Sequence, residues 1–486
     1  MSLPPIAAFT ATWASVDQHV AAPQWFQDAK FGIYHHWGAF SIPAFNNEWY
    51  PREMYRPGSI EREHHITTYG DPAQWPYHRF IDGGHDKAGR FVQFAPKLVS
   101  DGGSFDPREW AQLIADAGAR FAGPVAEHHD GFSMWDSRAN EWNSVARGPR
   151  LNLLGLFAQA YREQGLKLLV AMHHAFHFTG YFEHVPPQPT ATLRKLYGQL
   201  DPVAENRLWL AKLKEVVDLA RPDIIYQDVN LDKIDESAGL EFLAYYYNRA
   251  QEWGADVVAT YKDGFNDKGQ VYDYERGGPA DLTYPYWLAD DILSTSSWCY
   301  TDGIGYHPLE VIVHSLIDRV SKNGGMLLNI SPTARGAIPD EQRALLRGIG
   351  DYLRRCGESV YETRAWEVYG EGPTAMGAGP FTPPVAGTAR DIRFTRDKHN
   401  TALYATILGW PTSPLVATTL AADRIDLTGL RTLELLGPDP GEYIPLTDHR
   451  QHENGLHITL PQTPPFNAPA YVLKLTFQQT IPILRH

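Results

Sequence analysis

The chain has 486 residues, of which 43% are hydrophobic and 21% are charged, a composition typical of a soluble globular protein. Its length exceeds what one ordinary core accommodates, so two domains are expected. The formal net charge of −14 argues against a nucleic acid or an anionic membrane as partner, no apolar run is long enough to span a membrane, and two cysteines are too few for a disulfide framework.

The N-terminal region shows no leader pattern and then one strand. Residues 1–22 lack a basic segment followed by an apolar run, so no signal peptide is expected. The compartment stays open between the cytoplasm and a secreted or periplasmic form without its leader. The apolar run 31–34 is typical of a buried strand, and it leads into His36. Residues 51–104 are expected to be irregular.

From residue 106 onward, helices and strands alternate. Each unit has a helix with apolar residues at helical spacing, usually a glycine that can end it, and a short apolar strand. The expected helices lie at 106–117, 153–161, 213–220, 240–250 and 309–320, and the expected strands at 121–125, 167–172, 222–226, 257–260 and 326–330. Such alternation indicates a parallel sheet covered by helices.

Polar side chains recur where these strands end. The strand-end residues are His36, His128, His129, His174, Asp228 and Lys262. In a closed (β/α)8 barrel the carboxyl ends of all strands converge on one face, where active sites form, whereas an open sheet explains the set less well. The predicted fold is therefore an α/β fold with a (β/α)8-like TIM barrel.

The character of the chain changes towards its C-terminus. Residues 369–387 are rich in Gly, Pro and Thr, as in a linker, so the barrel is expected over 1–368. Beyond the linker, turn residues separate short runs with strand character, at 391–395, 401–408, 432–436, 457–460 and 471–477. Residues 388–486 are therefore expected to form an all-β domain, a sandwich.

Two adjacent histidines, His128 and His129, stand where the strand 121–125 gives way to a loop. A buried strand needs neither imidazole for packing, and a hydroxyl-rich ligand could use both as hydrogen-bond partners. The high aromatic content, with 14 Trp and 25 Tyr, also suits a site that stacks against sugars. The alternative is that both histidines are structural.

Several motifs occur together and in a fixed order. They are Ala29-Lys30-Phe31-Gly32-Ile33, His36-Trp37-Gly38, Ser41-Ile42-Pro43-Ala44, Glu48-Trp49-Tyr50, His128-His129-Asp130-Gly131-Phe132 and Asn323-Gly324-Gly325-Met326-Leu327-Leu328-Asn329-Ile330-Ser331-Pro332-Thr333. This set resembles the α-L-fucosidases of glycoside hydrolase family 29 over about residues 25–370, and the β-rich tail resembles that family's C-terminal sandwich. The resemblance implies a retaining glycosidase with a nucleophilic Asp and a separate acid/base carboxylate.

The resemblance also implies the catalytic pair. The family's nucleophile lies in a Pro-Asp-apolar-apolar-Trp-Phe-Asp stretch, which is similar to residues 222–228 and points to Asp228, with Tyr226 and Gln227 as departures. Glu275, at a similar distance past the nucleophile, is the expected acid/base on a loop between aromatic residues, where desolvation can raise its pKa. The alternatives for the acid/base are Asp273, Asp290 and Asp291.

The residues that the resemblance implies for substrate binding are His36, Glu48, Trp49, His128, His129, Tyr226 and Lys262. Trp49 or Tyr226 is expected to lie against the apolar face of the sugar. Lys262 takes the place of an Arg, so a point charge replaces a planar fork. Where the family has a Tyr-rich strand end, this chain has His173 and His174, whose roles stay open.

The implied activity is hydrolysis of terminal α-L-fucosyl residues from oligosaccharides or glycoconjugates, with no cofactor and no metal. The preferred linkage and the oligomeric state are not indicated. One alternative is a metal-dependent TIM-barrel hydrolase that uses His128, His129 and Asp130, or His173, His174 and His177. Two others are a barrel glycosidase for a related sugar such as a galactoside, and a fucose-binding module without catalysis.

Overall fold

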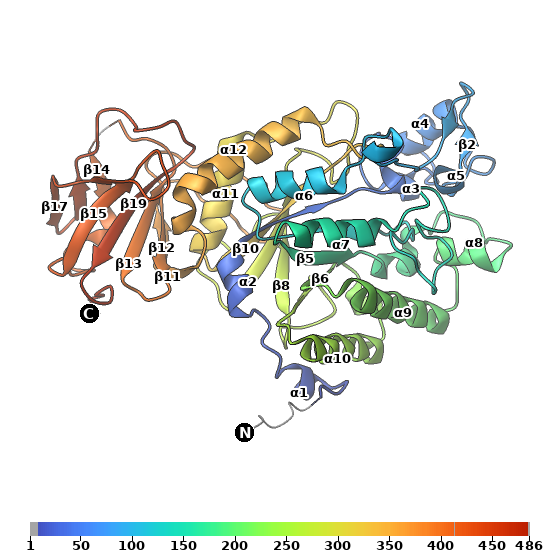
Figure 1. Cartoon of the computed structure of the whole chain (residues 1–486), viewed down its shortest axis with the longest axis horizontal. Coiled ribbons are helices and arrows are strands. Elements are labelled where there is room, and N and C mark those ends of the chain that lie inside the picture. The colour runs from blue at the N-terminus through green and yellow to red at the C-terminus, as the bar shows by residue number, and fades with distance from the viewer. Residues whose placement is uncertain (1–7, 413, 485–486) are drawn as a thin grey trace.

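The computed structural model describes residues 8–412 and 414–484. Eight parallel strands close into a barrel in the order β1-β10-β9-β8-β7-β6-β5-β4. They span Phe31–His35 (β1), Phe121–Glu127 (β4), Lys167–Met172 (β5), Ile224–Gln227 (β6), Val258–Tyr261 (β7), Val271–Glu275 (β8), Trp287–Ile292 (β9) and Gly324–Ile330 (β10). The predicted (β/α)8-like TIM barrel is confirmed (Figure 1).

Two barrel strands, β8 and β9, lie in a region that the sequence pattern assigned to loops. Both strands carry buried acidic residues, so neither sequence shows an apolar run. Among the described residues, no helix lies between β7 and β9, so the alternation of helix and strand is also interrupted there. Glu275 is the last residue of β8, so the expectation that it lies on a loop is wrong. A strand end holds its side chain more rigidly than a loop does.

The major helices lie outside the strands: Pro107–Asp116 (α6), Leu153–Glu163 (α7), Pro202–Ala220 (α9), Glu236–Trp253 (α10), Leu309–Ser321 (α11) and Asp340–Cys356 (α12). Their starts follow capping rules. Asp106 accepts the backbone N–H groups of Arg108 and Glu109 at the start of α6, and Asp201 caps α9 in the same way.

Shorter elements complete the barrel domain. They are Trp13–Val16 (α1), Gln24–Ala29 (α2), Ala39–Ser41 (η1), Tyr50–Glu53 (α3), Ile60–Thr68 (α4), Arg79–Asp82 (α5), Gly84–His85 (β2), Phe91–Val92 (β3), Val99–Asp101 (η2), His177–Tyr181 (η3), Ala191–Leu196 (α8), Leu231–Lys233 (η4) and Gly357–Ser359 (η5). The irregular structure expected over 51–104 is therefore wrong for α4, a helix too polar to show an apolar stripe.

The interior of the barrel is filled with side chains. The cluster there includes Tyr34, Phe121, Leu169, Ile224, Tyr226 and Leu288. Gly32 is required in this layer, because a Cβ at that position would lie 2.1 Å from the ring of Phe121. Tyr34 and Tyr226 end on hydroxyl groups that point to the carboxyl end of the barrel, where they meet Asp290.

The C-terminal part forms two antiparallel sheets. One has the order β11-β12-β13-β19-β15-β16 and the other β14-β18-β17. The strands span Thr363–Glu371 (β11), Ile392–Asp397 (β12), Ala402–Ile407 (β13), Leu415–Ala417 (β14), Leu430–Leu436 (β15), Tyr443–Pro445 (β16), His449–His452 (β17), Gly455–Ile458 (β18) and Tyr471–Phe477 (β19), with the short helix Thr418–Leu420 (η6) between β14 and β15. Both sheets contribute to one apolar core, as in the predicted sandwich.

The strand β11 straddles the boundary at residue 368 that the composition suggested. It pairs with β12, so the sheet domain already begins within the segment expected to close the barrel. Helices α11 and α12 lie between the barrel and the C-terminal sheets, and α11 contacts β11 and β12 (Figure 1). The two domains are thus joined by packing as well as by the linker.

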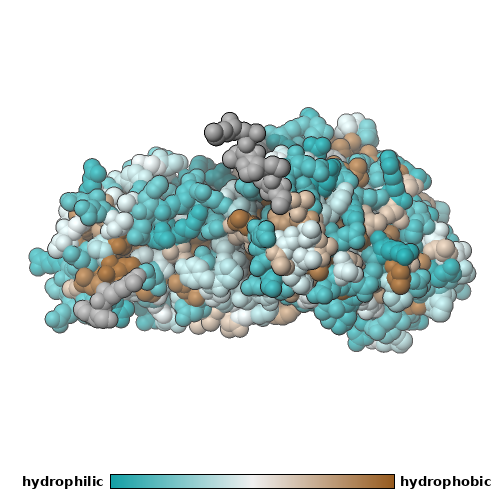
Figure 2. Space-filling model, turned by 90° about the horizontal axis from the view of Figure 1, so that it is seen from below, coloured by the Kyte–Doolittle hydropathy of each residue, from teal (hydrophilic) through white to brown (hydrophobic). Residues whose placement is uncertain are grey.

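The surface agrees with the acidic, polar composition. On the face shown in Figure 2, hydrophilic residues dominate and hydrophobic ones form small separate patches. Among the described residues, none of the helices combines the length and the apolar character that crossing a membrane would need.

Candidate active site

The carboxyl ends of seven barrel strands bring polar side chains to one place. His36 follows β1, His128 and His129 follow β4, His173 follows β5, Asp228 follows β6, Lys262 follows β7, Glu275 ends β8 and Asp290 lies in β9. Contacts within 4 Å link six of them: His129, His173, Asp228, Lys262, Glu275 and Asp290. Residues far apart in the chain thus meet at one rim because the strands are parallel and the sheet is closed.

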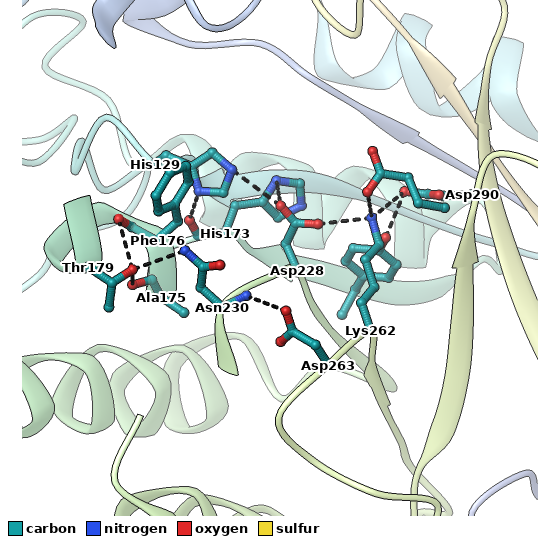
Figure 3. Close-up of polar contacts among 12 residues, drawn as sticks. His129, His173, Ala175, Phe176, Thr179, Asp228, Asn230, Lys262, Asp263 and Asp290 are labelled. Carbon is teal, nitrogen blue, oxygen red and sulfur yellow. Dashed lines mark hydrogen bonds and ion pairs between the residues drawn. The ribbon is translucent and has the colours of Figure 1, made fainter. Parts of the chain in front are cut away.

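Asp228 lies at the centre of this group (Figure 3). Its Oδ1 is 2.9 Å from Lys262 Nζ, and its Oδ2 is 3.3 Å from His129 Nε2 and 3.6 Å from His173 Nδ1. Burial alone would raise the pKa of the Asp228 carboxyl, but the charge of Lys262 and the two imidazoles hold that pKa well below its ordinary value. Asp228 is therefore an ionised carboxylate at neutral pH.

Glu275 shares the same ammonium group. Its Oε2 is 3.0 Å from Lys262 Nζ, so the nearest oxygens of Glu275 and Asp228 are at most about 6 Å apart, the sum of the two Lys262 distances. Burial raises the pKa of Glu275, and the charges of Asp290 and Asp228 raise it further against the opposing effect of Lys262. Two neighbouring carboxyl groups thus have pKa values shifted in opposite directions, the pattern of an acid and a nucleophile.

The alternative acids hold other positions. Asp290 Oδ2 lies 2.9 Å from the Tyr34 hydroxyl and 3.2 Å from Lys262 Nζ, deep in the barrel. Asp291, the next residue, points to the opposite side of the strand and pairs with Arg319 on α11 at 2.5 Å. Asp291 therefore faces away from Asp228, and Asp290 Oδ2 is already held by the hydroxyl groups of Tyr34 and Tyr226.

Asp273 and Asp290 share the hydroxyl group of Tyr226. Tyr226 Oη is 2.8 Å from Asp273 Oδ2 and 2.7 Å from Asp290 Oδ2. Burial and the neighbouring charge of Asp290 raise the pKa of Asp273 well above its ordinary value. Because a hydroxyl carries one proton, Tyr226 can donate to only one of these two carboxyl groups at a time.

Tyr226 is placed differently from the sequence expectation. Its side chain is fully buried below the carboxylates and its hydroxyl is occupied, so its ring does not line the rim against which a sugar could lie. Trp49 does lie at the rim, with its ring 5.6 Å from that of His129 and 5.7 Å from that of Phe176. Of the two aromatic residues expected against the sugar, Trp49 lies at the rim and Tyr226 is buried.

Three of the histidines at the site, His36, His128 and His173, are neutral. Burial lowers the pKa of His36 to about 3, and it lowers those of His128 and His173 well below the ordinary value. His36 Nδ1 donates to Asn329 Oδ1 at 2.7 Å, which leaves Nε2 as an acceptor. His129 Nδ1 donates to the carbonyl oxygen of His173 at 2.5 Å, which turns Nε2 toward Asp228.

Glu48 is held at the rim by the segment that follows β9. Its Oε2 accepts the backbone N–H of Trp298 at 3.0 Å and the hydroxyl of Ser297 at 3.2 Å. Burial raises the pKa of Glu48, although these hydrogen bonds oppose the shift. The ring of Trp298 lies 5.2 Å from that of His36, so the same segment also forms part of the wall.

Three of these residues received no role from sequence reasoning. His173 stands at a strand end like the others, and only the structure shows that it faces Asp228, whereas His174 stacks on Trp209 outside the site. Asn329 lies inside the motif at residues 323–333, but the sequence assigned it no role. Trp298 follows no motif, so no sequence signal identified it.

Two groups of three residues could hold a metal ion. Within the described part of the chain, ligand atoms of His36, His128 and His173 lie within 4.8 Å of one another, and so do those of His129, His173 and Asp228. Imidazole-rich groups of this kind suit transition metals rather than calcium or magnesium.

Comparisons with known proteins agree with the geometry. A family model described as alpha-L-fucosidase matches residues 5–358, and one described as the alpha-L-fucosidase C-terminal domain matches residues 387–476. The chain is similar to the tissue alpha-L-fucosidase of Rattus norvegicus, with 28% identity over 96% of this chain and 92% of the relative, and to the plasma alpha-L-fucosidase of Homo sapiens, with 26% identity over 93% and 89%. The crystal structure of Thermotoga maritima alpha-fucosidase in complex with fucose superposes with a TM-score of 0.73, at 27% identity over 96% of this chain and all of that one.

Proposed function

The chain belongs to the α-L-fucosidase family of glycoside hydrolases, and from that premise we propose that it is a retaining exo-α-L-fucosidase acting on fucosylated oligosaccharides or glycoconjugates. The observation that carries the proposal is the pairing of Asp228 and Glu275 through Lys262, with pKa values shifted in opposite directions. Their separation of at most about 6 Å suits the retaining mechanism, which needs about 5–5.5 Å, better than the wider gap of inverting enzymes.

In the first step, Asp228 attacks the anomeric carbon of the fucosyl unit. The bond from that carbon to the glycosidic oxygen breaks through an oxocarbenium-like transition state. Glu275 gives its proton to the departing oxygen, which leaves as a hydroxyl group, and the sugar remains as an ester of Asp228. The low pKa of Asp228 keeps it ionised for the attack, and the raised pKa of Glu275 favours the protonated form that the donation needs.

In the second step, Glu275 acts as a base. Formation of the ester removes the negative charge of Asp228, which is one of the charges that raise the pKa of Glu275. With Lys262 still 3.0 Å away, the carboxylate form of Glu275 is now favoured. It takes a proton from water, whose oxygen bonds to the anomeric carbon as the Asp228 ester breaks, and fucose leaves with its configuration retained.

Neutral imidazoles suit the recognition of the sugar hydroxyls. His36 has a defined tautomer because Asn329 accepts its Nδ1–H, and its free Nε2 can accept a hydrogen bond from a hydroxyl group. His128 and Glu48 offer further polar partners, and Trp49 offers an apolar face for the ring. A sugar without the matching hydroxyl would leave these buried groups unpaired, which is how such a site discriminates.

The decisive experiment is to trap the covalent intermediate. A 2-deoxy-2-fluoro-fucosyl fluoride slows the second step, so the intact protein should gain the mass of one fluorofucosyl group, and peptide mapping should place it on Asp228. The Asp228→Ala variant should gain nothing, whereas Asp263→Asn, which changes a neighbouring loop acid bonded to the backbone of Asn230 and Leu231, should label as the wild type does. A label on another carboxylate would overturn the assignment of the nucleophile.

A panel of aryl glycosides tests the substrate. We expect hydrolysis of an aryl α-L-fucoside and much weaker hydrolysis of aryl galactosides, because the rim offers polar partners for hydroxyls and an apolar wall for a methyl group. If kcat/KM were higher for an aryl galactoside than for the aryl α-L-fucoside, the proposed substrate would be a galactoside and not a fucoside. Loss of activity in a strong chelator would instead favour metal-dependent hydrolysis.

A further inference from the structure

Three histidine rings from three strand ends form a nearly equilateral triangle. The ring centroids of His36, His128 and His173 are 5.1–5.5 Å apart, and one ring nitrogen of each lies within 4.8 Å of the others. All three side chains are at most 4% exposed. We call this group the three-histidine cluster.

Two nitrogens of the three-histidine cluster have no partner. His128 Nδ1 and His173 Nε2 are buried and accept or donate no hydrogen bond within the residues that the structure describes. The Nε2 of His36 is also available, because Nδ1 is bonded to Asn329. Buried polar atoms are normally satisfied, so these two unpartnered nitrogens, in a cluster whose ligand atoms lie within 4.8 Å of one another, indicate that an external ligand completes them.

The surroundings of the cluster resemble those of metal-binding histidines. A metal-bound imidazole usually directs its second nitrogen to a carbonyl or carboxylate oxygen, which fixes the tautomer. His36 Nδ1 is 2.7 Å from the amide oxygen of Asn329, and His173 Nδ1 is 3.6 Å from Asp228 Oδ2. His36 and His173 thus each direct one nitrogen to an oxygen, as a metal-bound imidazole does.

We propose that the three-histidine cluster binds one divalent transition-metal ion of the zinc class and that this ion excludes the sugar. Tetrahedral zinc at 2.0–2.1 Å from each nitrogen would separate the nitrogens by about 3.4 Å, which lies within the 4.8 Å that bounds the ligand atoms of the cluster. The second half of the proposal rests on the proposed function, since His36 and His128 are the groups assigned to the fucose hydroxyls. The metal then acts as an inhibitor competitive with fucose.

Direct binding is tested with Co²⁺, whose visible absorption reports a tetrahedral nitrogen site. Titration of the untagged full-length wild-type chain should saturate at one equivalent, and Zn²⁺ should abolish the absorption. L-fucose at high concentration should weaken Co²⁺ binding at least tenfold. A wild-type titration without a saturable visible band would overturn the proposal, and this arm needs no variant.

Variants locate the site. His173→Phe should weaken Co²⁺ binding at least tenfold, whereas His184→Gln, a partly exposed histidine outside the cluster, should bind as the wild type does. Asp228→Ala should keep tetrahedral binding, which separates the cluster from the group of His129, His173 and Asp228. Full binding by His173→Phe, or loss of binding in Asp228→Ala, would overturn the assignment; circular dichroism checks that each variant is folded.

Steady-state kinetics test whether the bound metal ion excludes the sugar. With an aryl α-L-fucoside, Zn²⁺ should raise the apparent KM and leave kcat unchanged, and His184→Gln should respond as the wild type does. A fall in kcat at constant KM would overturn the competitive role. The two proposals fail separately: an inactive protein that still gives the Co²⁺ absorption would disprove the fucosidase mechanism alone, and an active one without that absorption would disprove the metal site alone.

Discussion

The Nζ of Lys262 lies 2.9 Å from Oδ1 of Asp228, in a position where both side chains are almost fully buried. Three further acidic side chains, those of Glu275, Asp290 and Asp273, lie within 4 Å of the same ammonium. Their charges raise the pKa of Lys262 well above its ordinary value although burial acts in the opposite direction. One cation therefore sets the protonation of both proposed catalytic carboxylates.

Replacing Lys262 should move the acid limb of the pH profile. Without the ammonium, burial dominates and the pKa of Asp228 rises, so the ionised nucleophile is lost at a higher pH than in the wild type. We expect Lys262→Met to lower kcat/KM for an aryl fucoside by about 10²–10³-fold near neutral pH and to shift its acid limb upward. Lys262→Arg keeps the charge and should keep the position of that limb; an unchanged limb in the Met variant would contradict this account.

Replacing Glu275 should affect substrates according to their leaving groups. The protonated form donates the proton, so kcat/KM of the wild type should fall as the pH rises through the raised pKa of Glu275. In Glu275→Ala this alkaline limb should disappear. Fucosylation by a dinitrophenyl fucoside, which needs no proton, should change little, while a fucosyl disaccharide should lose about 10²–10⁴-fold.

Azide provides the control for Glu275. As an anion, it attacks the fucosyl ester of Asp228 without a base, so it should restore turnover of Glu275→Ala and yield α-fucosyl azide with retained configuration. The Asp228→Ala variant forms no such ester and should not give this product. Equal losses for both leaving groups would assign the acid/base role to another carboxylate.

The barrel and several residues of its site can be predicted from the sequence for a physical reason. Parallel strands in a closed sheet end on the same face, so residues such as His36 and Asp228 can be placed together from their positions alone. The strands β8 and β9 could not be predicted in this way, because their buried acids, Asp273 and Asp290, interrupt the apolar pattern that identifies a buried strand. These acids are buried only because Lys262 and two tyrosines stabilise them, a relationship that no local pattern records.

The direction of a side chain at a strand end is the second thing that the sequence does not settle. His173 and His174 are adjacent, and successive residues of an extended chain point to opposite sides. His173 faces Asp228, whereas His174 stacks on Trp209 of α9 and its Nε2 donates to the carbonyl oxygen of Trp209. A shift of one residue at the end of β5 would exchange the directions of the His173 and His174 side chains. Which of the two faces the site therefore depends on the register of β5 in the barrel.

Asp273 should make stability depend on pH in a defined direction. Its pKa in the folded chain lies well above the ordinary value near 4, so between these two values the folded state binds a proton that the unfolded state has released. The free energy of unfolding therefore falls as the pH rises through this window. Asp273→Asn mimics the neutral acid and should show a flatter dependence in calorimetric scans, whereas Asp281→Asn, an exposed control, should keep the wild-type slope. An unchanged slope in Asp273→Asn would mean that Asp273 is ionised in the folded state too.

The buried ion pair beneath the adjacent histidines should dominate the local stability. Glu127, the last residue of β4, lies 2.5 Å from Lys212 Nζ on α9 and 2.5 Å from the Ser133 hydroxyl, with both charged side chains at most 2% exposed. Lys212→Met should destabilise the barrel by about 3–5 kcal/mol, because it leaves the Glu127 charge buried and unpaired.

Lys214 on the same helix is the matched control for Lys212. It also contacts an acid at 2.5 Å, Glu241, but that pair is solvent-exposed, so Lys214→Met should cost less than about 1 kcal/mol. Adding Glu127→Gln to Lys212→Met removes the unpaired charge and should recover much of the loss. Calorimetric unfolding of the wild type and these three variants measures the differences, and equal losses for the two lysines would show that burial of the Glu127 charge does not control stability at this strand end.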